Sequence, residues 1–276
     1  MDATCDLMAR AADWLRRARE VVVFTGAGAS AESGVPTFRD DAGFWQEFPP
    51  EEFAHWKGLL ATALVRPRRL AEFVYAVLGP IAAAEPNAGH RAIAAVEKHT
   101  RVTVVTQNID GLHQEAGSSR VLEVHGSLLE IASRRGRVLR VLSRARLRRI
   151  VAGVGRARRG WLALPRLLAA LRGFYGLGLR GFHRPNVVLF GDAMAEPAWT
   201  LAQEACRKCD LMIQVGCSLA VWPAALLPQA AKAAGARVIA IDPAAGEGDL
   251  WLPGTAAERL PALVQAAFGP LAGGAG

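Results

Sequence analysis

The sequence predicts an α/β protein built on one parallel β-sheet, and three observations indicate this. Short apolar, largely β-branched runs, such as Val21–Phe24, have the composition of buried strands. Segments with helical spacing alternate with these runs along the chain. Glycine-rich or polar residues follow several runs directly, at the edge where parallel sheets bind ligands. We therefore expect a Rossmann-like parallel sheet with helices on both faces, plus a smaller helical or irregular lobe.

The expected elements alternate in chain order. A helix over about residues 3–19 precedes the first strand, and residues 51–84 are helical in pattern, with breaks at Pro67 and Gly79-Pro80. Asn87 is expected to cap a helix that runs to about Lys98. Further strands are expected at Arg101–Thr106, Val121–Val124, Asn186–Phe190, Leu211–Val215 and Arg237–Ile241, and further helices at about residues 198–209, 224–234 and 257–268.

The length of 276 residues suits a single domain with a core and a lobe. We expect the Rossmann-like core at about residues 15–44, 86–131 and 184–268, and the small lobe at about 45–85 and 132–183. No apolar run reaches the roughly 18 residues that span a bilayer, and the N-terminus lacks the layout of a signal peptide. We expect a cytoplasmic protein with reduced cysteines and no membrane partner. The sequence leaves the oligomeric state open.

The net charge of +8 comes from one segment. Between Ala132 and His183 there are 14 arginines and no lysine, aspartate or glutamate. The rest of the chain carries 19 of the 33 basic residues and all 25 acidic residues, a net charge of −6. The basic character therefore belongs to this segment and not to the protein as a whole, and we expect no nucleic-acid partner.

Small residues follow the first strand at once. Gly26 and Gly28 allow close backbone approaches that a Cβ would forbid, and N–H groups at the start of a following helix can bind phosphate. The pattern G-x-G-x-x-A fits a dinucleotide fingerprint only loosely, because Ala31 replaces the third glycine. A glycine-rich turn without a ligand explains this loop equally well when it is taken alone.

Polar groups also follow other strands. Gln107–Asp110 comes after one strand, His125 after the next and Gly216–Ser218 after a third. Each has a structural explanation by itself, because Asn and Asp favour turns and a lone histidine is commonly a core residue. On one edge of one sheet, however, they supply backbone donors, hydroxyl and amide groups and a base. A dinucleotide needs this set, and the joint pattern predicts a site for one.

Five motifs in this order resemble those of the sirtuins, which are NAD-dependent protein lysine deacylases. They lie at Gly26–Arg39, Thr106–His113, His125–Ser127, Val187–Gly191 and Val215–Ser218. The resemblance covers about residues 15–131 and 184–268. It implies a single sirtuin-like catalytic domain that consumes NAD as a co-substrate and acts on acylated lysines of protein substrates.

The resemblance implies roles for individual residues. Nicotinamide leaves as the acyl-lysine oxygen attacks the ribose, and His125 then acts as general base on a ribose hydroxyl, giving acyl-ADP-ribose and free lysine. Asn108 is expected to be catalytic with His125, and with Asp110 it holds the nicotinamide carboxamide and nearby ribose. Phe38 shields the reacting centre from water, and Arg39 meets phosphate.

The resemblance also implies which residues bind the two substrates. Those that contact NAD are expected to be Gly26, Ala27, Gly28, Ser30, Phe38, Arg39, Gln107, Asn108, Ile109, Asp110, Gly216, Cys217, Ser218 and Asp242. Backbone groups that pair with the peptide substrate are expected at Val188, Phe190 and Gly191. Cys217 and Asp242 are mild departures, because the family usually has Thr or Ser at the first position and often Asn at the second.

Two further departures concern specificity and metal. Tyr75 is followed three positions later by Leu78, so the Tyr-x-x-Arg pair of members that remove acidic acyl groups is absent, and we expect acetyl or another uncharged acyl group as the substrate.

Most sirtuins have a zinc lobe built from two Cys-x-x-Cys pairs, but this chain has no cysteine between Ser127 and Arg184. Cys206 and Cys209 form one such pair on a later helix, which is too few ligands, so no structural zinc is expected.

The arginine-rich segment, residues 132–183, has three interpretations. It is a basic lobe that binds nucleic acid or an acidic partner, a zinc-free helical replacement for the missing lobe, or an out-of-frame translation of a GC-rich gene. Val138–Arg149 and Leu162–Leu171 have partly helical spacing, which fits the second. We favour the third hypothesis, because the resemblance stops and resumes abruptly and Lys, Asp and Glu vanish together.

Two alternatives to deacylation follow from the same residues. One is a catalytically impaired, regulatory NAD-binding protein, against which the intact Asn108, Asp110 and His125 argue. The other is mono-ADP-ribosyl transfer to protein, which uses the same nicotinamide chemistry with a different acceptor.

The reading-frame hypothesis predicts a frame change near Ile131 and its reversal near His183. Independent sequencing of the gene across these positions tests it. An uninterrupted frame, shared by close relatives that carry the same segment, would rule it out.

Overall fold

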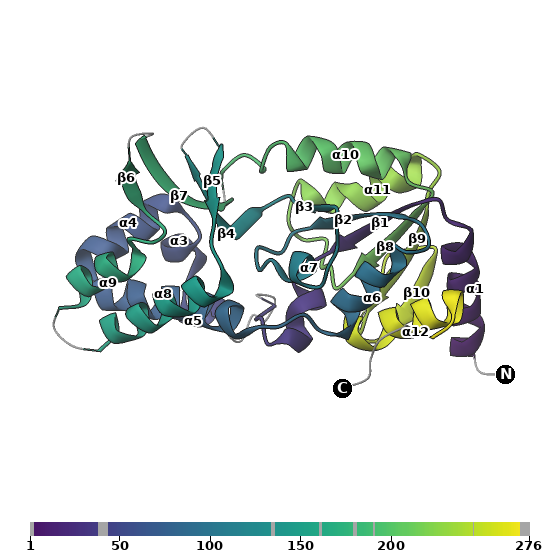
Figure 1. Cartoon of the computed structure of the whole chain (residues 1–276), viewed down its shortest axis with the longest axis horizontal. Helices are drawn as coiled ribbons and strands as arrows, with labels where there is room; N and C mark the ends of the chain where they lie inside the picture. Colours follow the sequence, from purple (N-terminus) through teal and green to yellow (C-terminus); the bar gives the residue numbers. More distant parts are fainter. Residues whose placement is uncertain are drawn as a thin grey trace. The chain divides into compact units, whose positions relative to one another are not determined.

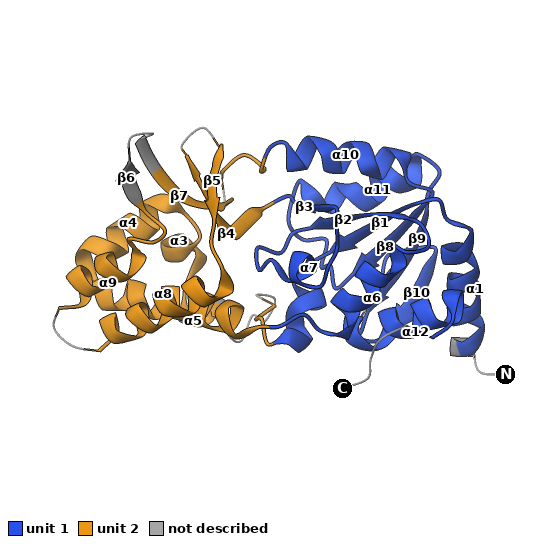
Figure 2. Cartoon of the chain, viewed as in Figure 1, with its two compact units in different colours: residues 1–33, 85–124, 196–276 blue, residues 34–84, 125–195 orange. Residues whose placement is uncertain are grey.

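The computed structural model describes residues 3–37, 44–133, 136–159, 162–178, 181–189, 191–244 and 246–270. The chain divides into two compact units (Figure 2). Unit 1 is Met1–Ser33, Glu85–Val124 and Glu196–Gly276, and unit 2 is Gly34–Ala84 and His125–Ala195. Each unit has its own sheet, and the chain passes between the units at the ends of these segments.

Unit 1 is built on a six-stranded parallel sheet in the order β10-β9-β8-β1-β2-β3 (Figure 1). Its strands are β1 (Glu20–Thr25), β2 (Arg101–Thr106), β3 (Val121–Glu123), β8 (Leu211–Val215), β9 (Arg237–Asp242) and β10 (Leu250–Pro253). Because all the strands run the same way, their carboxyl ends share one edge of the sheet. The predicted Rossmann-like α/β fold is confirmed.

Helices cover both faces of this sheet, with α10 and α11 on one side and α1, α6 and α12 on the other (Figure 1). The helical elements of unit 1 are α1 (Ala3–Arg17), the 3₁₀ helix η1 (Ala27–Ser33), α6 (Ala88–Val96), α7 (Leu112–Glu115), α10 (Ala198–Lys208), the 3₁₀ helix η2 (Ala224–Leu226), α11 (Leu227–Ala233) and α12 (Ala256–Phe268). Asn87 caps α6, as predicted, by accepting hydrogen bonds from the Gly89 and His90 N–H groups.

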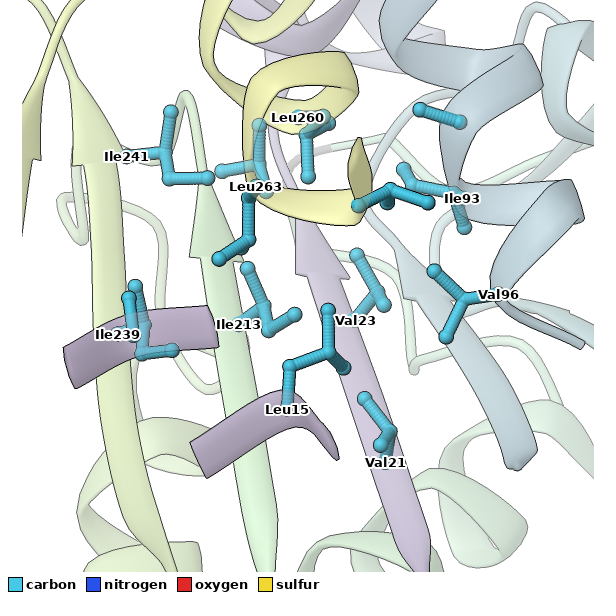
Figure 3. Packing of buried hydrophobic residues seen from close by; sticks show 14 of the residues in the cluster. Leu15, Val21, Val23, Ile93, Val96, Ile213, Ile239, Ile241, Leu260 and Leu263 are labelled. Atoms are coloured by element: carbon cyan, nitrogen blue, oxygen red, sulfur yellow. The ribbon is translucent and has the colours of Figure 1, made fainter. Parts of the chain in front are cut away.

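The core of unit 1 fills the space between the sheet and one helical layer. Val21 and Val23 of β1 point towards Leu15 of α1 and Leu263 of α12, and all four side chains are buried (Figure 3). Val22 and Phe24, on the opposite face of β1, are buried as well. A central strand of a parallel sheet is covered on both faces, and Val21–Phe24 is therefore a continuous apolar run.

Unit 2 combines helices with a four-stranded antiparallel sheet in the order β5-β4-β7-β6. Its strands are β4 (Gly126–Ser133), β5 (Val138–Val141), β6 (Gly176–Gly178) and β7 (Gly181–Val187). Its helices are α2 (Phe44–Glu47), α3 (Pro50–Phe53), α4 (Trp56–Val65), α5 (Pro67–Ala83), α8 (Arg144–Ala157) and α9 (Ala163–Leu171). In the described ranges of both units, no helix is long and apolar enough to cross a membrane.

Three sequence-based expectations about unit 2 are corrected. Helix α5 continues through Pro80, because a proline removes one helical hydrogen bond without preventing the next turn. Val138 begins a strand and not a helix, and α8 starts after Ser143, whose hydroxyl accepts a hydrogen bond from the Arg146 N–H. The strand expected at Asn186–Phe190 ends at Val187 and belongs to the antiparallel sheet of unit 2.

The packing in Figure 3 predicts the cost of removing one core side chain. Leu263 is fully buried, so Leu263→Ala should lower the free energy of unfolding by about 2–5 kcal/mol in a urea titration. Leu226 is 40% exposed, and Leu226→Ala serves as the control with a change below about 1 kcal/mol. Equal losses in both variants would contradict this account of the core.

Candidate functional site

Two buried threonines end neighbouring strands at the shared edge of the parallel sheet. Thr25 of β1 and Thr106 of β2 are register partners, and their hydroxyl oxygens lie 2.7 Å apart in a hydrogen bond. The Thr106 hydroxyl also accepts a hydrogen bond from the Asn108 N–H at 3.0 Å. The threonine pair thereby fixes the start of the loop that carries Asn108 and Asp110.

The loops after β1 and β8 touch through their backbones. The Gly26 N–H donates to Val215 O at 3.0 Å, and the Gly28 N–H donates to Gly216 O at 3.1 Å. A Cβ on Gly26 would lie 2.7 Å from Gly216 O, and one on Gly28 would lie 2.6 Å from the Gly216 Cα. Gly216 itself has φ +59° and equally close neighbours. All three positions therefore require glycine, as the sequence predicted for Gly26 and Gly28.

A buried hydroxyl joins three predicted site residues. The Ser30 hydroxyl donates to Asp110 Oδ2 at 2.7 Å and accepts from Asn108 Nδ2 at 3.0 Å. The second Nδ2 hydrogen of Asn108 goes to Gly26 O, also at 3.0 Å. Asp110 Oδ1 accepts from the N–H of Leu112, the first residue of α7, at 2.9 Å. Ser30, Asn108, Asp110 and Gly26 thus form one hydrogen-bonded cluster, the Ser30 cluster, at the sheet edge.

Two buried histidines support this cluster from behind. His90 Nδ1 lies 3.3 Å from the Asn87 N–H and accepts its hydrogen, so the ring proton is on Nε2, which lies 3.5 Å from the Ser30 hydroxyl. The His113 ring lies 4.7 Å from the His90 ring, and its Nε2 is 3.0 Å from the Thr25 hydroxyl. The Ser30 hydroxyl therefore donates once and accepts twice, which uses its whole hydrogen-bonding capacity.

Burial keeps both imidazoles neutral. It lowers the pKa of His90 to about 4, with a smaller contribution from the nearby Arg91 charge. Burial also lowers the pKa of His113 well below its usual value, and His90 adds to this effect. The two histidines therefore keep their neutral hydrogen-bonding pattern across the physiological pH range.

The remaining predicted residues of unit 1 lie beside the glycine contact. Cys217 is a buried thiol that donates towards Phe24 O and Val215 O, and Gln107 Nε2 lies 3.9 Å from its sulfur. Asp242, at the end of β9, is buried and accepts the Ala244 N–H through Oδ1. Ser218 is exposed, whereas Ala27 and Ile109 are half-buried.

His125 begins the second segment of unit 2, directly after Val124, which ends the middle segment of unit 1. Its carbonyl accepts a hydrogen bond from the Val188 N–H at 2.9 Å, so two predicted residues of this unit are brought together. The next residue, Gly126, has φ +73°, and a Cβ there would lie 1.8 Å from Asn186 O. Gly191, which has φ +88°, is exposed. Phe38, Arg39 and Phe190 lie outside the described residues.

Asp192, which was not among the predicted site residues, holds the loop that carries Val188. Its Oδ2 accepts from Trp56 Nε1 at 2.9 Å and from the Leu189 N–H at 3.3 Å, and it lies 3.9 Å from the Arg184 guanidinium. Thr25, Thr106, His90 and His113 were missed as site residues too. A threonine at the last position of two strands was the available signal for the first two.

The residues of unit 2 do not fit structural zinc. All four cysteines of the chain lie in unit 1, and none of the described residues forms a group of three potential metal ligands. Burial raises the pKa of both the Cys206 and Cys209 thiols to about 12, and Cys209 donates its S–H to Cys206 O. Together they supply two ligands, whereas a structural zinc site needs about four.

The parallel sheet, the glycine contact and the polar cluster at the strand ends define an α/β nucleotide-binding protein. The Sir2 family model matches residues 26–223, more than half of the chain. The chain belongs to the Sir2 family.

Curated relatives and solved structures agree. The chain is 39% identical over 267 residues to an NAD-dependent protein deacylase of Desulfosudis oleivorans, covering 92% of this chain and 93% of the relative. It is 40% identical to NAD-dependent protein deacylase 2 of Pyrobaculum aerophilum, with the same coverage. A Sir2 homologue in complex with ADP ribose has a TM-score of 0.74 and 28% identity over 97% of this chain and 96% of that one. Sir2Af2 bound to a myristoylated histone peptide has a TM-score of 0.67 and 31% identity over 95% of this chain and 96% of that one.

The depressed pKa of His90 predicts a pH dependence of stability. The unfolded chain takes up a proton at this residue as the pH falls below about 6.5, whereas the folded chain does so only near pH 4. Stability is therefore lost as the pH falls between these values. Between pH 7 and pH 5 the wild type should lose about 2 kcal/mol more than His90→Gln in urea titrations. Parallel profiles for wild type and His90→Gln would contradict the prediction.

Proposed function

We propose that this chain is an NAD-dependent protein lysine deacylase that uses the Ser30 cluster to bind nicotinamide and ribose and His125 as its general base. Membership of the Sir2 family and the activity named for its relatives support the reaction class. The observation that carries the assignment of residues is the Ser30 cluster itself. Its amide, hydroxyl and carboxyl groups suit an amide and hydroxyl groups, and they lie beside a glycine loop at the end of β1.

Asn108 would present one defined atom to the ligand. Both hydrogens of its Nδ2 are engaged, by Gly26 O and by the Ser30 hydroxyl. Its Oδ1 is therefore the atom that would accept a hydrogen bond from a carboxamide N–H or a ribose hydroxyl. Asp110 would act beside it, and its hydrogen bonds to Ser30 and Leu112 already fix its carboxylate.

The dinucleotide would lie along the row of loops at the sheet edge. Backbone N–H groups of the Gly26–Gly28 loop and Arg39 would meet its phosphates, while Gln107, Ala27 and Ile109 would flank the ribose. Gly216, Cys217, Ser218 and Asp242 would line the adenosine side. Phe38 would keep water from the reacting centre.

The reaction we propose consumes NAD. The bond between the ribose and nicotinamide breaks as the acyl oxygen of the substrate lysine bonds to the same ribose carbon. His125 then removes a proton from a ribose hydroxyl, which attacks the acyl carbon. Water completes the transfer, so that the lysine amine and acyl-ADP-ribose leave.

The peptide would pair with the chain that follows β7. The Val188 N–H is taken by His125 O, so the Val188 carbonyl is the group that would accept from a peptide N–H. Phe190 and Gly191 would continue this edge, which Asp192 holds through Trp56 and Leu189. Protein substrates are consistent with the histone peptide bound to Sir2Af2. A cytoplasmic location stays a prediction.

Mass spectrometry tests the proposed activity. The protein should convert NAD and an acetyl-lysine peptide to nicotinamide, deacetylated peptide and acetyl-ADP-ribose. His125→Ala should slow this at least about 100-fold, because general base catalysis contributes 10²–10⁴-fold. His55→Ala, at an exposed position, is the control and should keep the wild-type rate. Nicotinamide release without a change in peptide mass would contradict deacylation, and ADP-ribosylated protein would indicate the transferase instead.

A second comparison tests the acyl preference. We expect acetyl-lysine to react faster than succinyl-lysine, because Leu78 occupies the place of the arginine that would pair with an acid. In the structure the Arg158 guanidinium lies 4.2 Å from the ring centre of Tyr75, which makes Arg158→Gln the informative variant. A wild-type preference for succinyl-lysine that disappears in Arg158→Gln would overturn the expectation.

A further inference from the structure

Helices α8 and α9 line a cavity of about 730 Å³ within unit 2 that is open to solvent. Six arginines line it and all six are exposed: Arg146, Arg149, Arg156, Arg159, Arg166 and Arg172. The first four belong to α8 or its C-terminal end, and the last two to α9 or its end. The cavity therefore collects cations from both helices.

No described carboxylate balances these charges. None of the six arginines takes part in an ion pair with the described residues, and residues 132–183 contain no Asp or Glu. Arg166 donates one hydrogen bond to Arg159 O, which leaves its other N–H groups for a ligand. Arg140, Arg144 and Arg148 differ, because they donate to backbone carbonyls of the unit and do not line the cavity.

Small residues lie on the facing sides of the two helices. Gly153 of α8 is so close to Ala170 of α9 that a Cβ on it would lie 2.8 Å from the Ala170 Cβ. Ala169 and Gly173 line the same cavity, and Ile150 is buried at its base. The helices therefore pack closely at these residues, while the longer arginine side chains form the walls.

Six uncompensated guanidinium groups around one cavity repel one another, and a multivalent anion relieves that repulsion. A guanidinium forms paired, charge-assisted hydrogen bonds with phosphate oxygens. The volume lies within the roughly 300–1,000 Å³ of small-molecule sites. We propose that this cavity binds a small, multiply phosphorylated anion. A concave cluster favours such a ligand over nucleic acid, whose phosphates are spaced along an extended backbone.

The test is calorimetric titration of sodium tripolyphosphate into the full chain at 0.15 M NaCl, without NAD. The wild type should bind it more tightly than pyrophosphate and far more tightly than orthophosphate, because the number of phosphate contacts falls along this series. The triple variant Arg149→Gln, Arg156→Gln, Arg166→Gln should bind at least tenfold more weakly. The triple variant Arg10→Gln, Arg19→Gln, Arg207→Gln removes the same charge from exposed positions of unit 1 and should bind within twofold of the wild type.

Circular dichroism checks that each variant folds. If the triple variant of the cavity arginines does not fold, the single variant Arg156→Gln replaces it and should weaken binding at least threefold. Lysine at the three cavity positions should restore part of the affinity, because charge is kept while the paired geometry is lost. Three results would overturn the proposal: no heat with tripolyphosphate, equal losses in the two triple variants, or tight binding of a 20-nucleotide single-stranded DNA with none of tripolyphosphate.

Discussion

The contact of Gly26 and Gly28 with Gly216 is the constraint on which the site of unit 1 depends. It joins the loops after β1 and β8 without any side chain between them, and a single methyl group at any of the three positions would separate them. Because these strands are parallel neighbours, both loops leave the sheet at the same edge. Gly26 also presents its carbonyl to Asn108, so the contact sets the position of the polar cluster. The glycines are explained by the protein's own packing before any ligand is considered.

The hydrogen bonds around Ser30 explain why the cluster is specific as well as stable. A hydroxyl that donates once and accepts twice permits one arrangement of its neighbours, and His90 must be neutral to take part as it does. Low dielectric strengthens these bonds and makes an unpaired group costly, so the network holds Asn108 and Asp110 in fixed orientations. The low pKa of His90 is therefore part of the geometry of the site.

Sequence predicted the parallel sheet, the Asn87 cap and the loops at the strand ends, because apolar period, capping and glycine spacing are local signals. It did not predict the antiparallel sheet of unit 2, in which Gly126 must pair with Val187 some 60 residues later. It also missed His90, His113 and Asp192, whose partners lie far away in sequence. Phe38, Arg39 and Phe190 lie outside the described residues, and their roles stay predictions. Local chemistry can be read from a sequence, whereas the pairing of distant polar groups depends on the finished fold.

The arginine-rich segment, residues 132–183, contains local signals that its composition obscured. Its composition and the abrupt interruption of the family resemblance suggested a lost reading frame. In the structure, Ser143 caps α8, and Leu147, Ile150, Val154 and Ala157 recur at helical spacing on its buried face. That face packs on α5, while the arginines occupy the other positions. Agreement between cap, period and packing is what a sequence that specifies its fold displays. In unit 2 the hydrophobic packing of α8 on α5 orders this segment without metal ligands among its described residues, and the reading-frame hypothesis stays a prediction that gene sequencing tests.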